Sequence, residues 1–384
     1  MPNRAIPSIN SSSRFGSGSD VGATASVLVL VISAAAAFVA CMPSHRMTPD
    51  VAPGRSCPDV SEHAWYLPEA KGGQDRLNDW CRTVGPPVVS PEPTANFGGL
   101  PSGDTLTVVS WNVDVGGGDV AAFLETELRL ACDGSSSRLA SGADHFVLLV
   151  QEAFRRSNEI PETPSGATIP RAVVEDERPG ERLDAVEVAA RCGLSLVYVA
   201  AARNGSEPND GKREDKGVAI LSTLPLGDVF FVELPYEAAR RVAAMATVRD
   251  ESGRRLRLAN LHLISAAGPS RALTTGNGSR LRQGLAVSDA VDQAEAGGEP
   301  ISTLLAGDFN TWSDRETTLR RLREQFPDSP PPLEEGTHGA FPTDHILFRS
   351  GSEGVVLREN SYVRLEERYY SDHHPIQVEL RFAD

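Results

Sequence analysis

Short apolar runs separated by polar stretches recur along the chain from about residue 104 onwards. Four of them have the length and β-branched content of buried strands, and they span residues 106–111, 146–150, 194–201 and 217–222. Residues 242–249 and 256–263 form a further pair around a turn, and residues 377–382 alternate as a strand does. Helical spacing follows Asp119 and covers residues 281–296. Strands that alternate with helices predict an α/β fold.

Polar residues lie where these apolar runs stop, at the ends of the predicted strands. They are Asn112, Glu152, His262, Asp308, Asn310, Asp344, Asp372 and His373. Each has an ordinary structural explanation as a cap, a solvated acid, a core histidine or a turn residue. Residues i and i+2 of an extended chain point the same way, so Asp308 and Asn310 can converge on one oxygen or one metal-bound water. Because the strands of packed sheets end on a common rim, the whole set predicts one polar site.

Composition narrows the chemistry of that site. The chain has 384 residues and a net charge of −15, which argues against tight, indiscriminate binding of nucleic acid. The same carboxylates are suitable ligands for a divalent cation. The glycines of residues 116–118 are followed by no lysine, so an ATP- or GTP-binding loop is disfavoured.

The first 103 residues divide into two segments. Residues 1–41 carry an uncharged apolar stretch over 21–40 that predicts an export signal or membrane anchor. Cys41, in the context Phe38-Val39-Ala40-Cys41, resembles the lipidated cysteine of a bacterial lipoprotein, although Phe38 departs from the usual Leu. An uncleaved transmembrane helix is the alternative. In either case we expect the body of the protein to work outside the cytoplasm. Residues 42–103 read as a Pro- and Gly-rich tether with a small Cys-containing element, before a catalytic domain over 104–384.

The remaining cysteines fit an exported chain. If Cys41 is lipidated, four are left, which permits two disulfides in three connectivities. We favour Cys57 with Cys81, because both lie in a segment too small to have much core. Cys132 and Cys192 could equally be free and buried.

Seven short motifs together resemble the endonuclease/exonuclease/phosphatase superfamily, in its order and over roughly residues 105–384. They are Ser110-Trp111-Asn112, Gln151-Glu152, Gly217-Val218-Ala219-Ile220-Leu221-Ser222, Asn260-Leu261-His262, Gly307-Asp308-Phe309-Asn310, Asp344-His345-Ile346 and Ser371-Asp372-His373-His374-Pro375. The resemblance implies a four-layer α/β sandwich, with two mixed β-sheets packed face to face and helices outside. It also implies hydrolysis of phosphoesters with a divalent metal, usually Mg²⁺, with Mn²⁺ or Ca²⁺ as alternatives.

The resemblance also assigns roles to the residues. Glu152 would be the principal metal ligand, with Asn112 and Asp372 close to the same ion. Asp308, supported by Asn310, would orient and deprotonate the attacking water. His262 and His373 would flank the phosphoryl group as cationic imidazoles, and Asp344 would hold His373.

Several neighbouring residues carry weaker expectations. Asp114 follows Trp111-Asn112 at a spacing where some members of the family, but not others, have an additional metal-binding carboxylate. The pairs Arg240-Arg241 and Arg203-Asn204 could meet substrate phosphate or form surface ion pairs. His345 and His374 point the other way along their strands, so we interpret them as structural.

The scaffold does not fix the substrate. Our first hypothesis is a phosphodiesterase of nuclease type acting on nucleic acid outside the cytoplasm. A phospholipid or sphingomyelin phosphodiesterase is second, since membrane attachment would suit it, although no exposed apolar hairpin is evident. A phosphatase of small molecules is third, and a catalytically silent binding protein is a remote alternative. The sequence predicts no protein partner.

Overall fold

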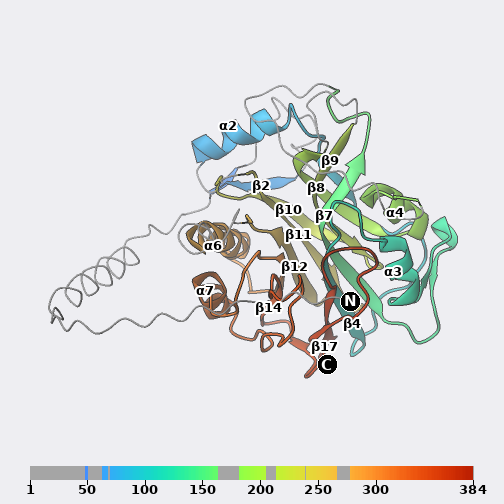
Figure 1. Cartoon of the computed structure of the whole chain (residues 1–384). Coiled ribbons are helices and arrows are strands. Elements are labelled where there is room, and N and C mark those ends of the chain that lie inside the picture. The colour runs from blue at the N-terminus through green and yellow to red at the C-terminus, as the bar shows by residue number, and fades with distance from the viewer. Residues whose placement is uncertain are drawn as a thin grey trace, which may run out of the picture. The chain divides into compact units, whose positions relative to one another are not determined.

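The computed structural model describes residues 48–50, 63–67, 70–162, 181–204, 213–237, 239–265 and 277–383 (Figure 1). The predicted signal or anchor over residues 1–41 lies outside the described residues, and so does Cys57. None of the helices in the described part of the chain is long and apolar enough to cross a bilayer.

One sheet has eight strands. Their order across the sheet is β15 (Val355–Leu357), β17 (Ile376–Phe382), β4 (Thr105–Asn112), β7 (His145–Arg156), β9 (Glu214–Ser222), β8 (Ser195–Asn204) and β3 (Val88–Ser90), with β16 (Val363–Arg364) also paired to β17. β4 and β7 run parallel, whereas β9 is antiparallel to both β7 and β8. Mixed pairing of this kind is the expected result for a sheet built from both hairpins and crossovers.

The other sheet has seven strands. Their order is β1 (Thr48–Asp50), β2 (Ala64–Leu67), β10 (Gly227–Glu233), β11 (Val242–Arg249), β12 (Arg255–His262), β13 (Ser302–Asp308) and β14 (Asp344–Arg349). A separate two-stranded ribbon joins β5 (Leu130–Ala131) to β6 (Arg138–Leu139).

The two sheets face each other across an apolar core. Alternate residues of each strand fill it, such as Val108 and Leu149 from one sheet and Ala244 and Leu304 from the other. α3 (Val120–Thr126) and α4 (Ala185–Cys192) cover the outer face of the eight-stranded sheet. α6 (Asn277–Ala294) and α7 (Thr317–Gln325) cover the outer face of the other. The four-layer α/β prediction is therefore confirmed.

The local predictions hold where the sequence period is strong. The side chain of Asp119 caps α3 by accepting a hydrogen bond from the Ala122 N–H. The pair at residues 242–249 and 256–263 is the β11–β12 hairpin. β10 and α7 were not predicted. The apolar run of β10 is only four residues long, at 229–232, and is flanked by Asp228 and Glu233, while α7 has few apolar residues.

β7 corrects one prediction. We expected the strand to stop at Gln151-Glu152, but it continues to Arg156 through a β-bulge at Glu152. Glu152 has φ +52°, and the pairing with β9 shifts by one residue there. A bulge re-aims one side chain without ending the strand, so Glu152 can serve the rim while later residues stay paired.

Residues before 104 also join both sheets. β2 pairs with β10, β3 pairs with β8, and α2 (Ala70–Trp80) lies between them in the chain. Trp65, Leu77 and Trp80 are buried in the core clusters, as expected for aromatics that pack a short segment onto its neighbour. The division between a tether over residues 42–103 and a catalytic domain over 104–384 stays a prediction.

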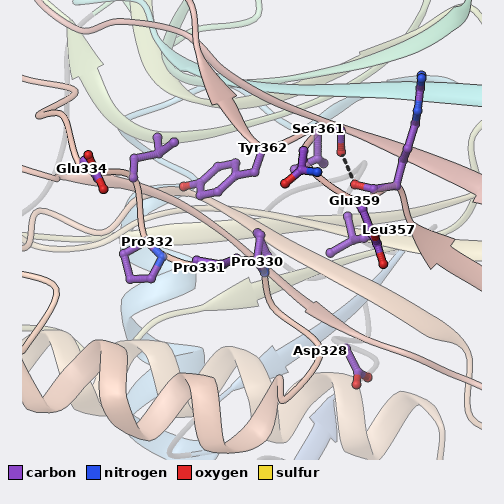
Figure 2. Close-up of a pocket in the computed structure, with 13 residues that line it drawn as sticks. Asp328, Pro330, Pro331, Pro332, Glu334, Leu357, Glu359, Ser361 and Tyr362 are labelled. Carbon is purple, nitrogen blue, oxygen red and sulfur yellow. Dashed lines mark hydrogen bonds between the residues drawn. The ribbon is translucent and has the colours of Figure 1, made fainter.

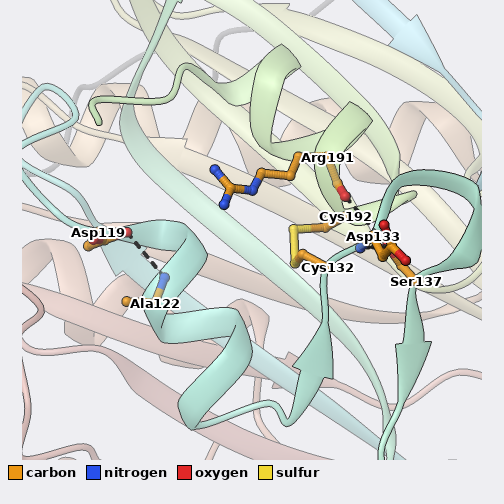
Figure 3. The surroundings of a disulfide bond; sticks show 7 residues. All are labelled: Asp119, Ala122, Cys132, Asp133, Ser137, Arg191 and Cys192. Atoms are coloured by element: carbon orange, nitrogen blue, oxygen red, sulfur yellow. Dashed lines mark hydrogen bonds between the residues drawn. A yellow bond between two sulfur atoms is a disulfide. The ribbon is translucent and has the colours of Figure 1, made fainter. Parts of the chain in front are cut away.

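A disulfide joins Cys132, directly after β5, to Cys192 at the end of α4 (Figure 3). The sequence had left these two cysteines open between pairing and burial as free thiols. Cys81 is also disulfide-bonded, and its partner lies outside the described residues. Its pairing with Cys57 stays a prediction.

Candidate active site

Three predicted residues lie side by side where strands of the seven-stranded sheet meet the rim. In the strand register His262 of β12 opposes Asp308 of β13, and Asp308 opposes Asp344 of β14. Gly307 makes this close approach possible, because a Cβ on Gly307 would lie 1.9 Å from the carbonyl oxygen of Leu261. Packing therefore requires a glycine at position 307, directly before the carboxylate of Asp308.

The eight-stranded sheet contributes Asn112 from the end of β4. Its Nδ2 donates a hydrogen bond to Oδ2 of Asp308 at 3.0 Å, which links the two sheets at the rim. Deeper in the core, Nε2 of Gln151 donates to Oδ1 of Asn260 at 2.7 Å and makes a second link. Both amides are buried, so these bonds fix the distance between the sheets at the site.

Asp308 connects several members of the site. Besides Asn112, its carboxylate accepts a hydrogen bond from the backbone N–H of Asn310 at 2.7 Å, and it lies 3.4 Å from Nε2 of His262. The side chain of Asn310 turns away and donates to the carbonyl of Leu263. Burial, together with the Asp344 carboxylate, raises the pKa of Asp308 to about 7. A carboxylate in that range can accept a proton near neutral pH.

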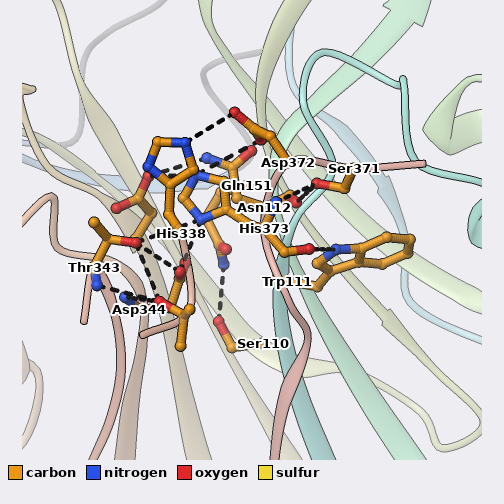
Figure 4. A network of polar contacts seen from close by, with 12 residues as sticks. Ser110, Trp111, Asn112, Gln151, His338, Thr343, Asp344, Ser371, Asp372 and His373 are labelled. Carbon is orange, nitrogen blue, oxygen red and sulfur yellow. Dashed lines mark hydrogen bonds and ion pairs between the residues drawn. The ribbon is translucent and has the colours of Figure 1, made fainter. Parts of the chain in front are cut away.

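His373 is held in one orientation (Figure 4). Its Nδ1 lies 2.8 Å from Oδ2 of Asp344, and its Nε2 lies 4.0 Å from Oδ2 of Asp308. Its backbone carbonyl accepts a hydrogen bond from Nε1 of Trp111. Burial disfavours the charged ring, but the Asp344 carboxylate outweighs it and raises the pKa of His373 to about 10. His373 is therefore a cation with Nε2–H directed away from Asp344.

His262 differs from our expectation of a second cationic imidazole. Its ring is buried, and burial together with the positive charges of Arg241 and Lys216 lowers its pKa well below the usual value. Its Nδ1 lies 4.0 Å from Oε1 of Glu152 and its Nε2 lies toward Asp308. The two histidines therefore face the same carboxylate in different protonation states, and sequence spacing carries no signal for that difference.

The predicted metal ligands occupy two neighbouring positions on the rim. Glu152 forms an ion pair with Lys216 at 3.1 Å; burial raises its pKa, but the charges of Lys216 and Arg241 outweigh this, so the net shift is downward. The carboxylate of Asp372 lies 3.2 Å from Nε2 of His338 and 3.8 Å from Nε2 of His373. Shared coordination by Asn112, Glu152 and Asp372 stays a prediction.

Among the described residues, two sets bring three potential metal-ligand atoms within 4.8 Å of one another. They are His338, Asp372 and His373, and Asp308, Asp344 and His373. Carboxylate oxygens dominate the wider rim, and they suit a hard divalent cation. These carboxylate and imidazole groups could hold a divalent cation.

His338 is the residue that sequence reasoning missed. Its ring stacks on that of His373 at 4.5 Å between centroids and 9° between planes, and the two backbones form an isolated β-bridge. A tight turn, closed by hydrogen bonds between residues 337–338 and Phe341, carries His338 over the site. A His after Gly-Thr in a Pro-rich loop has no periodic neighbours, so only the tertiary contact identifies it.

The residues given weaker expectations are mostly structural. His374 bonds the carbonyl of Leu365, and Arg203 donates to the carbonyls of Pro161 and Glu162. Asp114 donates its backbone N–H to Oδ1 of Asn112, and its role as a metal ligand stays a prediction.

His345 is structural as expected, and it gives a prediction on acid stability. Its Nε2 is hydrogen-bonded to the carbonyl of Pro342 and to Thr311, each at 2.8 Å, and burial lowers the pKa of His345 from 6.5 to about 4. Between about pH 6.5 and pH 4, His345 is therefore protonated in the unfolded chain and neutral in the folded chain. This contribution to stability is complete above about pH 6.5 and is lost as the pH falls to about 4, amounting to roughly 3 kcal/mol.

We expect His345→Gln to reduce the loss in free energy of unfolding between pH 7 and acidic pH. The measurement is the free energy of unfolding from urea titrations at pH 7 and pH 4.5, compared within each variant. His374→Gln, which removes a half-buried histidine, is the control. An unchanged difference between the two pH values in His345→Gln would contradict this interpretation.

A groove of about 500 Å³ lies elsewhere on the same unit (Figure 2). Residues 330–334, Leu357, Tyr362 and Val378 are among the residues that line it. None of the predicted site residues lines it, so the candidate active site rests on the strand-end residues.

Comparison with known proteins gives a family match over most of the chain. The sequence pattern that defines the Endonuclease/Exonuclease/phosphatase family matches residues 109–373. Among proteins with curated functions, none matches the chain.

Three solved structures are similar in fold. An endonuclease/exonuclease/phosphatase from Beutenbergia cavernae DSM 12333 is 18% identical, with a TM-score of 0.48, covering 73% of this chain and 72% of that one. A family protein from Bacteroides thetaiotaomicron is 14% identical, with a TM-score of 0.43 and coverage of 73% and 98%. ANGEL2, a 2′,3′-cyclic phosphatase, is 14% identical, with a TM-score of 0.46 and coverage of 73% and 96%.

Proposed function

Because the chain belongs to the endonuclease/exonuclease/phosphatase family, a family of phosphoester hydrolases, we propose that it is a divalent-metal-dependent phosphodiesterase of nuclease type. One observation carries this proposal. Asn112 and His262, from different sheets, both contact Oδ2 of the buried Asp308 carboxylate, and Nε2 of His373 lies 4.0 Å from the same oxygen. A base and a cation fixed around a common space suit attack of water on a phosphorus centre.

Each side chain then has a defined task. Asp308 accepts the proton of the attacking water, since its raised pKa places it near neutrality. Asn112 and the Asn310 N–H keep its carboxylate in place. Asp344 fixes His373 as a cation, whose Nε2–H offsets negative charge on the phosphoryl oxygens as the new P–O bond forms and the ester bond breaks.

A bound divalent metal would supply the remaining positive charge. A divalent cation, Mg²⁺ in our proposal, would be held by Glu152 with Asn112 and Asp372 and would stabilise charge on the phosphoryl oxygens when bound. Lys216 forms an ion pair with Glu152 at 3.1 Å, and the net effect of burial and of the charges of Lys216 and Arg241 is a lowered pKa for that carboxylate, which keeps it ionised.

A phospholipid phosphodiesterase is the second candidate, and exposed aromatics beside the site favour it. Trp312 and Phe341 contact each other with centroids 4.9 Å apart, and both are about two-fifths exposed. Thr311 ties the two loops together through the Pro342 carbonyl. Aromatic rings of this kind can sit among lipid headgroups, although the loop provides no larger apolar surface.

We also propose that the chain works outside the cytoplasm. The Cys132–Cys192 disulfide and the disulfide-bonded Cys81 support an oxidising compartment. Anchoring through residues 1–41 remains part of the same proposal.

A substrate panel tests the function. The full chain would be given plasmid DNA, RNA, sphingomyelin, phosphatidylinositol phosphates and bis(p-nitrophenyl) phosphate. Each assay would be run with Mg²⁺, with EDTA, and with Mg²⁺ restored after EDTA. We expect hydrolysis of a nucleic acid and of the chromogenic diester that EDTA abolishes and Mg²⁺ restores. Turnover of lipids alone would favour the second candidate, and turnover of no substrate with metal present would contradict both.

A further inference from the structure

The sequence treats Arg240 and Arg241 as equivalent, but the structure gives them different environments. Arg240 is buried and fully engaged, because its Nε and Nη2 donate to the carboxylate of Glu233 and its Nη1 donates to the carbonyl of Ala200 in the other sheet. These bonds join the end of β10 and the β10–β11 connection to β8. Arg240 therefore holds the two sheets together.

Arg241 is the opposite case. Its backbone carbonyl accepts a hydrogen bond from Leu234, but its buried Nε has no partner. Its guanidinium makes no hydrogen bond or ion pair with any residue in the described part of the chain. A buried donor without an acceptor is costly, so such a group calls for an explanation, and a ligand is one.

The position of Arg241 indicates which ligand. β11 begins at Val242, and its register with β12 pairs Ala243 with Leu261, so Arg241 lies at the end of the sheet that carries His262. Burial lowers the pKa of Arg241, while the carboxylates of Glu152 and Asp308 act in the opposite direction. The guanidinium thus lies within electrostatic reach of both site carboxylates and hydrogen-bonds to neither.

We infer that Arg241 is a substrate-binding residue that donates hydrogen bonds to the unesterified oxygens of a phosphoryl group at the candidate active site. The planar guanidinium presents paired N–H groups that match two oxygens of one tetrahedral oxyanion. The inference rests on the proposed function for the identity of the substrate, but it assigns a contact that can be measured without turnover. Arg240, by contrast, supports the fold.

Binding of inorganic phosphate by the full chain tests the assignment. Isothermal titration in Mg²⁺ would compare the natural protein with Arg241→Gln and Arg241→Lys, and Mg²⁺ affinity would be measured separately for each. Arg249→Gln is the matched control, because Arg249 ends the same strand and pairs on the surface with Asp228, both side chains being half exposed.

Arg241→Gln should lower the affinity for phosphate without lowering the affinity for Mg²⁺. We expect Arg241→Gln to weaken phosphate binding by about ten- to a hundredfold, because charge-assisted hydrogen bonds are lost. The same change removes a positive charge near Glu152 and Asp308, so it should leave Mg²⁺ affinity equal or higher. Arg241→Lys should be intermediate, and Arg249→Gln should match the natural protein. Folding should be retained, since no hydrogen bond is broken, and thermal unfolding checks this.

The outcomes separate this inference from the proposed function. Phosphate binding by Arg241→Gln within about twofold of the natural protein would overturn the assignment, even if the enzyme hydrolyses diesters. Failure of the natural protein to bind phosphate would also overturn it. If the natural protein binds phosphate through Arg241 but cleaves none of the panel, the inference stands and the nuclease proposal falls.

Discussion

Asp308→Asn should lower phosphodiester hydrolysis by about 10² to 10⁴, the contribution expected of a positioned general base. The amide keeps the shape of the side chain and can still accept a hydrogen bond from Asn112, but it cannot take a proton from water. The measurement is kcat and KM on bis(p-nitrophenyl) phosphate in Mg²⁺. We expect the loss to fall mainly on kcat, because the proton transfer belongs to the chemical step.

Asp308→Asn should not lose stability along with its activity. Burial and the Asp344 carboxylate raise the pKa of Asp308 to about 7, so at neutral pH its ionised form is unfavourable in the folded state. A neutral amide removes that repulsion, and the midpoint of thermal unfolding should stay equal or rise. Asp314→Asn, a change to a nearby carboxylate on the Trp312 loop, is the control and should alter neither quantity. Activity of Asp308→Asn above about a tenth of the natural value would remove Asp308 from the role of base.

The sequence predicts the part of the site that depends on strand ends. His262 and Asp308 follow apolar runs and Asp344 precedes one, and because the ends of adjacent strands meet at one rim, their convergence follows from the pattern. Asn112 reaches them from the second sheet for the same reason. The four-layer arrangement came from the family resemblance, with the alternation of strands and helices in agreement.

Other features of the site could not be predicted, because they depend on strand register, on irregular backbone or on contacts made after folding. Glu152 points to the rim through a bulge, and an extra residue in a strand is visible only when its partner strand is known. His338 reaches His373 from a loop without any periodic signal. The opposite protonation preferences of His262 and His373 depend on which carboxylate or cation each ring meets after folding.

Residues 83–90 illustrate a different limit, because proline-rich composition suggested a linker there. The structure instead pins this segment through a buried charge network. The backbone N–H of Gly85 donates to Asp215 at 2.8 Å, and Nη1 of Arg155 donates to the carbonyl of Pro86 at 2.7 Å. Proline-rich composition alone indicates a linker, but the hydrogen bonds of Gly85 and Pro86 to the buried Asp215–Arg155 pair fix the position of this segment.

That network gives the largest expected change in stability. Asp215 accepts from Nε and Nη2 of Arg155 and from the hydroxyl of Tyr198, and the side chains of Arg155 and Asp215 are 1% and 0% exposed. Asp215→Asn leaves the guanidinium of Arg155 buried without a counter-charge. We expect the free energy of unfolding to fall by about 3–5 kcal/mol. Urea titrations would report it as a lower midpoint at an unchanged slope.

Two comparisons decide whether the uncompensated charge is the cause. Asp228→Asn breaks a half-exposed pair with Arg249 and should cost less than about 1 kcal/mol. Arg155→Met combined with Asp215→Leu removes both charges at once, and it should recover much of the stability lost in Asp215→Asn, because no ion then remains buried alone. If the double variant is no more stable than Asp215→Asn, the hydrogen bonds to Gly85, Pro86 and Tyr198, rather than the charge pair, hold this segment in place.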